Sequence, residues 1–140
     1  MAFGNPYKED CDPDSLVRLI KRLDDIGVGT IALADTIGVS NPANITLLFS
    51  SLISEYPSIE FGAHFHTTQD SWEEKVEAAY QNGCRRFDAA LKGYGGCPIA
   101  KDELVGNMPT ERLITYFQDN LRINKHELDK GLALSSLVFA

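Results

Sequence analysis

Apolar side chains recur along the chain with two alternating spacings. Stretches with apolar positions three and four residues apart are typical of amphipathic helices, and short, nearly continuous apolar runs are typical of strands that are buried on both faces. In the first helix, Asp12 is expected as the N-terminal cap and Pro13 as the first helical residue, and Gly27 ends the helix. The pattern predicts helices near residues 12–27, 40–56, 71–82, 110–120 and 125–139, and strands over residues 30–34, 59–64 and 86–91.

The alternation of strand and helix predicts the fold class. Strands separated by single helices, at a period of roughly 26 to 30 residues, indicate right-handed βαβ units and a parallel sheet, an α/β fold. The first residues are expected to be the end of a further strand. Four such units make about half of an eight-unit barrel, which takes about 250 residues. We therefore expect the C-terminal half of a TIM (β/α)8 barrel, with a small open doubly wound domain as the alternative.

Composition and charge narrow the classes of partner. The chain has 140 residues, of which 44% are hydrophobic and 24% charged, as expected for one globular domain over residues 1–140. A net charge of -7 and a pI near 4.8 predict no nucleic-acid partner and no membrane partner. The first residues lack the pattern of a signal peptide, and the three cysteines form no even disulfide framework. These features favour a reducing, cytoplasmic location.

Two histidines stand at the end of the strand predicted over residues 59–64. His64 and His66 are two residues apart, so their side chains would point to the same face of a strand. In parallel α/β sheets, reactive groups gather at the carboxyl ends of the strands. The pair suits a divalent metal, and the alternative is a pair of hydrogen-bonded structural histidines.

Two further polar residues have an ordinary interpretation beside a functional one. Asn107 could offer its amide oxygen to a hard cation such as Mg²⁺ or Mn²⁺, or it could simply be a turn residue. Asp35 follows a buried strand. Its carboxylate could position substrate or move a proton, or it could cap the turn that leads to Gly38.

A glycine-rich loop carries the third kind of chemistry. Residues 93–100 hold Gly93, Gly95 and Gly96 next to Cys97 and Pro98, which predicts a flexible loop with a thiol near its tip. Such a thiol could donate or accept a proton once the loop closes over a site, and the alternative is an incidental thiol.

Taken together, these motifs resemble those of the 3-hydroxy-3-methylglutaryl-CoA lyase family, a group of metallolyase (β/α)8 barrels. The resemblance covers essentially the whole chain. It is carried by the sequence Gly-Gly-Cys-Pro at 95–98, by Gly-Asn at 106–107 with Thr-Glu at 110–111, by Asp-Thr-Ile-Gly at 35–38, and by His-x-His at 64–66. The histidine and Asp-Thr motifs are shared by related isopropylmalate and citramalate synthases. The Gly-Gly-Cys-Pro loop selects the lyase.

The resemblance implies a chemistry and a role for each residue. It implies cleavage of an acyl-CoA substrate, 3-hydroxy-3-methylglutaryl-CoA, to acetyl-CoA and acetoacetate with a divalent cation, Mg²⁺ or Mn²⁺. His64, His66 and Asn107 would be metal ligands, and Cys97 the acid/base thiol. Asp35 would lie by the substrate and help to transfer a proton, with His64 as a second participant.

Two departures from the family pattern qualify this expectation. The family's remaining carboxylate ligand, an Arg beside it and a further Glu lie on early barrel strands that this chain lacks, and Lys-Asp-Glu-Leu at 101–104 replaces small residues in the loop. We therefore expect the isolated chain to be inactive or nearly so, and its open sheet edges to favour a homodimer. The alternatives are a related aldol-type lyase or Claisen condensing enzyme, and a non-catalytic α/β binding domain.

Overall fold

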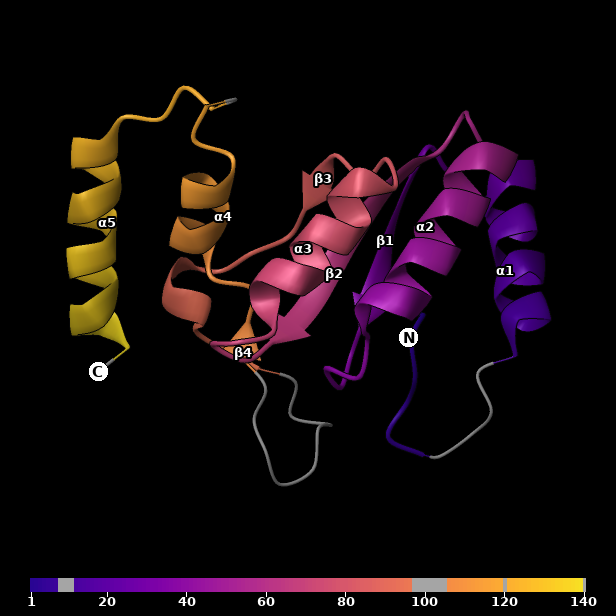
Figure 1. Cartoon of the computed structure of the whole chain (residues 1–140), viewed down its shortest axis with the longest axis horizontal. Coiled ribbons are helices and arrows are strands. Elements are labelled where there is room, and N and C mark those ends of the chain that lie inside the picture. Colours follow the sequence, from indigo (N-terminus) through magenta and orange to yellow (C-terminus); the bar gives the residue numbers. More distant parts are fainter. Residues whose placement is uncertain (8–11, 97–105, 120, 140) are drawn as a thin grey trace.

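The computed structural model describes residues 1–7, 12–96, 106–119 and 121–139 (Figure 1). The five predicted helices and three of the predicted strands follow one another in the predicted order. The helices are α1 (Pro13–Asp25), α2 (Pro42–Glu55), α3 (Trp72–Gln81), α4 (Thr110–Tyr116) and α5 (Lys125–Val138). The strands are β1 (Thr30–Asp35), β2 (Glu60–Thr67), β3 (Arg86–Phe87) and β4 (Gly106–Asn107). A short 3-10 turn spans Leu91–Gly93. No helix in these described ranges is both long and apolar enough to cross a membrane.

The helix starts follow local side-chain chemistry. The Asp12 carboxylate accepts hydrogen bonds from the first N–H groups of α1, and a proline occupies the first turn, as predicted. Asn41 caps α2 in the same way and forms a capping box with Asn44. Asn124 caps α5. Because these bonds lie within three residues along the chain, they form wherever the sequence places them, and this is why the helix starts were predictable.

The sheet has three parallel strands in the order β1, β2, β3. The two-residue strand β4, which the sequence did not predict, pairs antiparallel with the end of β2. Residues 1–7 form no strand, contrary to the expectation for the first residues. The Ala2 N–H nevertheless donates to the Ala34 carbonyl at 2.8 Å, so the chain start lies beside β1.

Two strands differ in length from their predictions. β2 extends to Thr67 and thus contains both histidines, which were expected at and just beyond its end. β3 ends at Phe87 instead of Leu91. The Asp88 N–H still donates to the Ala63 carbonyl of β2, and the Ala90 N–H and carbonyl then bond to the Met108 carbonyl and the Thr110 N–H. The bonding partners of Ala90 lie about twenty residues later in the chain, so the sequence around β3 does not indicate where the strand ends.

Among the described residues, helices cover one face of the sheet. Figure 1 shows α2 and α3 lying over the strands. Phe61, Ala63 and Phe65 alternate along β2 and are all buried on this helix side. The other face carries the exposed residues Ala32 and Glu60. The side of the sheet that would be the interior of a closed barrel therefore has no covering helix in the described part of the chain, although His66 on this side is buried.

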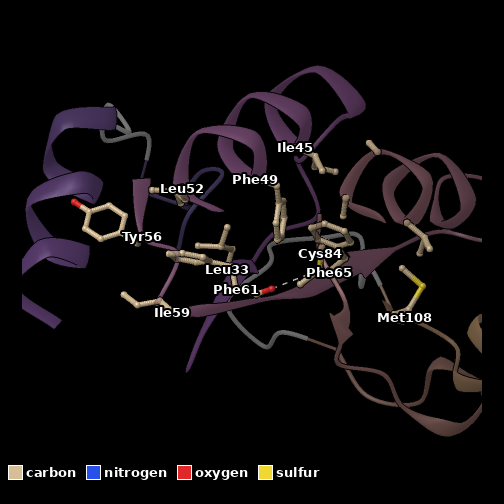
Figure 2. Packing of buried hydrophobic residues seen from close by; sticks show 14 of the residues in the cluster. Leu33, Ile45, Phe49, Leu52, Tyr56, Ile59, Phe61, Phe65, Cys84 and Met108 are labelled. Carbon is tan, nitrogen blue, oxygen red and sulfur yellow. Dashed lines mark hydrogen bonds between the residues drawn. The ribbon is translucent and has the colours of Figure 1, made fainter. Parts of the chain in front are cut away.

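The core lies between the sheet and helices α2 and α3 (Figure 2). Phe49 of α2 and Phe3 meet Phe65 of β2 edge to face, with ring centroids 6.4 Å and 5.8 Å from Phe65. Burying each such side chain contributes about 1.5–3 kcal/mol. Figure 2 also shows Cys84 in this core, near the Phe61 carbonyl. Removal from water raises the pKa of the Cys84 thiol to about 11, so this cysteine is a structural thiol.

Candidate active site

The two histidines of β2 lie together on the open face of the sheet. His64 pairs in register with Ala34, while its neighbour Phe65 points into the core, so alternation places His64 and His66 on the opposite, uncovered side. Their ring centroids are 5.5 Å apart. His66 is buried and His64 is about half exposed. The predicted pair of adjacent imidazoles on one face is therefore present.

Asn107 is brought to the same place by β4. Asn107 is the register partner of His66 across the antiparallel pair, although the two are far apart in sequence. Its Nδ2 donates to the Tyr94 carbonyl at 2.8 Å. Because a carbonyl only accepts hydrogen bonds, this contact orients the amide and leaves Oδ1 as the atom that can ligate.

Two glycines of the loop make this position of Asn107 sterically feasible. Gly93 and Gly95 have φ of +67° and +87°. A Cβ on Gly93 would lie 2.7 Å from the Asn107 carbonyl oxygen, and a Cβ on Gly95 would lie 2.9 Å from Asn107 Nδ2. The glycines expected to give flexibility thus also allow a close approach to Asn107.

Asp35 lies apart from the histidines. Its register partner is Phe65, so its side chain is on the helix side of the sheet. Its carboxylate is fully buried and accepts hydrogen bonds from Lys75 Nζ at 2.9 Å, Ser40 N at 3.1 Å and Ser40 Oγ at 2.5 Å. Asp35 therefore holds the turn after β1, in line with the turn-cap interpretation, and its predicted role in proton transfer stays a prediction.

The sequence analysis missed Lys75, the partner of Asp35. Lys75 is buried on α3, and its Nζ also donates to the carbonyls of Gly38 and His66, both at 3.1 Å. It thereby ties the ends of β1 and β2 together. Position 75 falls between Trp72 and Ala79 in the apolar stripe of α3, and a lysine within such a stripe was the available signal.

Asp88 is a second residue that the sequence analysis left without a role. Its Oδ2 lies 3.3 Å from His64 Nδ1 on the open face. The strand register places Arg86 beside Gly62, so Asp88, two residues further on, falls on the same side as His64. No sequence signal short of this register could have paired Asp88 with His64.

A pocket lies beside the site at the carboxyl end of the sheet. It has a volume of about 290 Å³. Its lining includes the residues that follow the histidines, the end of the glycine turn, and β4: Thr67, Thr68, Gln69, Lys92, Gly93 and Asn107. Cys97, the predicted acid/base thiol, lies outside the described residues, as does the rest of the segment 97–105.

The donor set fits a divalent cation but is incomplete. Two imidazoles and an amide oxygen are ligand types that Mg²⁺ and Mn²⁺ accept, with carboxylates and water completing the coordination. The described ranges hold no group of three or more His, Cys, Asp or Glu side chains that could bind a metal. These residues could therefore hold one side of a metal site.

The structure first defines a class. The chain is a partial TIM barrel with a parallel-strand α/β fold. It superimposes with a TM-score of 0.84 on an HMG-CoA lyase from Brucella melitensis, 21% identical over 98% of this chain and 49% of that chain, a likeness of fold. An HMG-CoA lyase from Acinetobacter baumannii, in complex with coenzyme A and 3-methylmalate, gives a TM-score of 0.74 at 36% identity over 84% of this chain and 38% of that one.

The sequence comparison then gives the family. The HMGL-like family model matches residues 1–138, so the chain belongs to the HMGL-like family. An (R)-citramalyl-CoA lyase from Chloroflexus aurantiacus is 35% identical over 99% of this chain and 42% of its own length. A hydroxymethylglutaryl-CoA lyase from Bacillus subtilis is 31% identical over 98% of this chain and 46% of its own length. The chain thus spans less than half the length of these curated relatives.

Proposed function

We propose that this chain is part of a metal-dependent lyase that, in its full-length form, cleaves 3-hydroxy-3-methylglutaryl-CoA to acetyl-CoA and acetoacetate. His64, His66 and Asn107 are its ligands for Mg²⁺ or Mn²⁺. The observation that carries the proposal is the cross-strand pairing of His66 with Asn107, with His64 on the same face as His66. Membership of the HMGL-like family and the lyase names of the relatives support the reaction type.

The reaction is a retro-Claisen cleavage. A base takes the proton of the tertiary hydroxyl, the neighbouring carbon-carbon bond breaks, and its electron pair forms the enolate of acetyl-CoA. The bound cation supplies Lewis-acid polarisation of the substrate oxygens. In this proposal Cys97 gives a proton to the enolate carbon, while His64 acts as a ligand. The participation of His64 and Asp35 in proton transfer remains a prediction.

The proposal includes low activity for the 140 residues by themselves. Two imidazoles and one amide leave a hexacoordinate cation short of protein ligands. The open face of the sheet would also admit water to the enolate, which a closed site excludes. Residues that complete the site would come from a further barrel segment or from a second chain.

A second candidate substrate is citramalyl-CoA. The (R)-citramalyl-CoA lyase matches this chain over nearly its whole length at slightly higher identity than the Bacillus subtilis enzyme does. Both substrates present a hydroxyl and a carboxylate to the same kind of cation site. Measuring the formation of acetyl-CoA from each substrate separately distinguishes the two.

Metal binding tests the site itself. We expect Mn²⁺, followed by electron paramagnetic resonance, to bind the wild-type chain and to bind at least tenfold more weakly after His64→Ala or His66→Ala. His126→Ala is the matched control, since this exposed histidine lies in the first turn of α5. Equal Mn²⁺ binding by all four proteins would refute the metal site and favour a non-catalytic α/β domain.

Measuring turnover tests the proposed low activity of the chain and its substrate. We expect the chain with Mg²⁺ and substrate to release acetyl-CoA at a rate far below the 1–1000 per second of typical enzymes. A rate in that range would show that the chain needs no further segment. Metal binding combined with release from citramalyl-CoA alone would reassign the substrate.

A further inference from the structure

His64 has a carboxylate partner on the neighbouring strand. His64 Nδ1 and Asp88 Oδ2 lie 3.3 Å apart. Both side chains are part-exposed, with 42% and 36% of their surfaces accessible, so the contact lies at the open face of the sheet and outside the hydrophobic core. The partner is therefore placed where it can act on the ring that the proposed metal site uses.

The backbone holds Asp88 in this position. The Asp88 N–H donates to the Ala63 carbonyl at 2.9 Å, which joins Asp88 to the residue just before His64. This bond continues the parallel pairing of β2 with β3, in which Ala63 is the register partner of Phe87. Side chains on two adjacent, main-chain-bonded strands keep a nearly constant separation. The contact between Asp88 and His64 is thus built into the sheet.

The second carboxylate oxygen of Asp88 faces the guanidinium group of Arg86. Arg86 Nε lies 3.8 Å from Asp88 Oδ1, and Arg86 Nη1 lies 3.8 Å from Glu60 Oε2. Arg86 is two residues before Asp88 and on the same face. The two oxygens of Asp88 therefore have different neighbours, the guanidinium on one side and the imidazole on the other, and this arrangement orients the carboxylate towards His64.

The chemistry of the pair selects one tautomer. An ionised carboxylate only accepts hydrogen bonds, so the proton between Asp88 and a neutral His64 resides on Nδ1. The other ring nitrogen, Nε2, then keeps its lone pair. Metal-bound histidines commonly donate their second N–H to a carboxylate, which fixes the ring and raises the basicity of the ligating nitrogen.

We propose that Asp88 is a positioning residue that holds His64 as the Nδ1–H tautomer and presents Nε2 to the metal. The inference rests on the proposed function for its metal, but the tautomer itself is a property of the metal-free chain. Asp88 touches neither substrate nor cation in this role and acts only through His64.

The first experiment reads the tautomer without any metal. Long-range ¹H–¹⁵N NMR of the full 140-residue chain at about pH 8 distinguishes a protonated Nδ1 from a protonated Nε2. We expect His64 as Nδ1–H in the wild type and as a mixture or as Nε2–H in Asp88→Ala. Asp88→Asn retains an accepting oxygen and should preserve part of the Nδ1–H population. Wild-type His64 protonated on Nε2 would overturn the proposal.

The second experiment measures Mn²⁺ affinity by electron paramagnetic resonance. We expect Asp88→Ala to weaken binding about 10- to 100-fold and Asp88→Asn to weaken it less. Asp129→Ala, which removes an exposed carboxylate of α5, should bind as the wild type does. If Asp88→Ala fails to fold, as judged by circular dichroism, the Asp88→Asn protein decides both readouts.

The outcomes separate this inference from the proposed function. If the wild type binds no Mn²⁺, the proposed metal site fails, and the metal-presenting role of Asp88 fails with it. If the wild type binds Mn²⁺ and both Asp88 variants bind it equally well, the metal site stands and only the role of Asp88 is refuted.

Discussion

Replacing Lys75 with Met should cost this protein a large part of its stability. Lys75 Nζ makes three hydrogen bonds, to Asp35 Oδ2 at 2.9 Å and to the Gly38 and His66 carbonyls at 3.1 Å each. The side chains of Lys75 and Asp35 are 3% and 0% exposed. Methionine keeps the length of the side chain but removes all three donors. Asp35 would then be a buried carboxylate that, within the described ranges, keeps hydrogen bonds from Ser40 alone.

The expected loss follows from the burial of the pair. Removing one partner of a buried ion pair typically costs about 3–5 kcal/mol, because the remaining charge is left uncompensated. The total free energy of unfolding of a small domain is only about 5–15 kcal/mol. With a urea m-value of about 2 kcal/mol/M, the midpoint of unfolding should fall by about 2 M. The same bonds join the β1 turn to the His66 carbonyl, so Mn²⁺ affinity should fall as well.

Urea unfolding followed by circular dichroism measures this loss. Lys130→Met is the matched control, because Lys130 pairs with Glu127 at 2.8 Å but is 56% exposed, so we expect a cost of at most about 1 kcal/mol there. The double variant Asp35→Asn with Lys75→Met should recover part of the loss, since it removes the unpaired charge. A midpoint for Lys75→Met no lower than that for Lys130→Met would refute the reasoning.

Three other predictions follow from single residues. Cys84 should resist thiol reagents until the protein unfolds. The pKa of its thiol is raised from 9.0 to about 11 in the folded protein, so the unfolded chain loses this proton at lower pH than the folded one. The free energy of unfolding of the wild type should therefore fall relative to that of Cys84→Ala as the pH rises from 9.0 to about 11. Parallel curves of unfolding free energy against pH for the two proteins would contradict this. Gly95→Ala should weaken Mn²⁺ binding, because Gly95 has a φ of +87° and an added Cβ would lie 2.9 Å from Asn107 Nδ2. In the control Gly131→Ala the added Cβ meets no atom within 4 Å, so Mn²⁺ affinity should stay unchanged. Equal Mn²⁺ affinities of these two variants would contradict the prediction. The homodimer expected at the open sheet edges should be seen in sedimentation equilibrium, and Leu137→Glu, at a position 79% exposed on α5, should leave it unchanged; a monomeric wild type would disprove the dimer.

Local chemistry explains which parts of the fold were predictable. Asn41 begins α2 because its side chain reaches N–H groups two and three residues away, and the sequence displays all of these residues together. Phe61 was expected in a buried strand because apolar runs of this length are typical of parallel sheets. The α/β class was predicted from the alternation of strands and helices and the partial barrel from the number of such units, and both are confirmed.

The errors lie where distant segments meet. β3 stops at Phe87 because the chain then pairs with residues near Met108, and β4 exists only because it pairs with β2. Lys75 was missed because lysine side chains are rarely buried. Its burial becomes understandable only when the structure shows the buried Asp35 carboxylate beside it, on the same side of the sheet.

By itself the sequence determined the order of the five helices and of strands β1, β2 and β3, the caps of α1, α2 and α5, the parallel sheet, and the two imidazoles on one face of a strand. The caps and the alternation of side chains depend on residues close together in the chain, and the parallel sheet was inferred from the alternation of strands and helices along it. Only the tertiary structure decided that Asn107 stands opposite His66, that Asp88 contacts His64, and that Asp35 lies on the far side of the sheet with Lys75. Strand register sets all three relations, and register depends on the whole sheet.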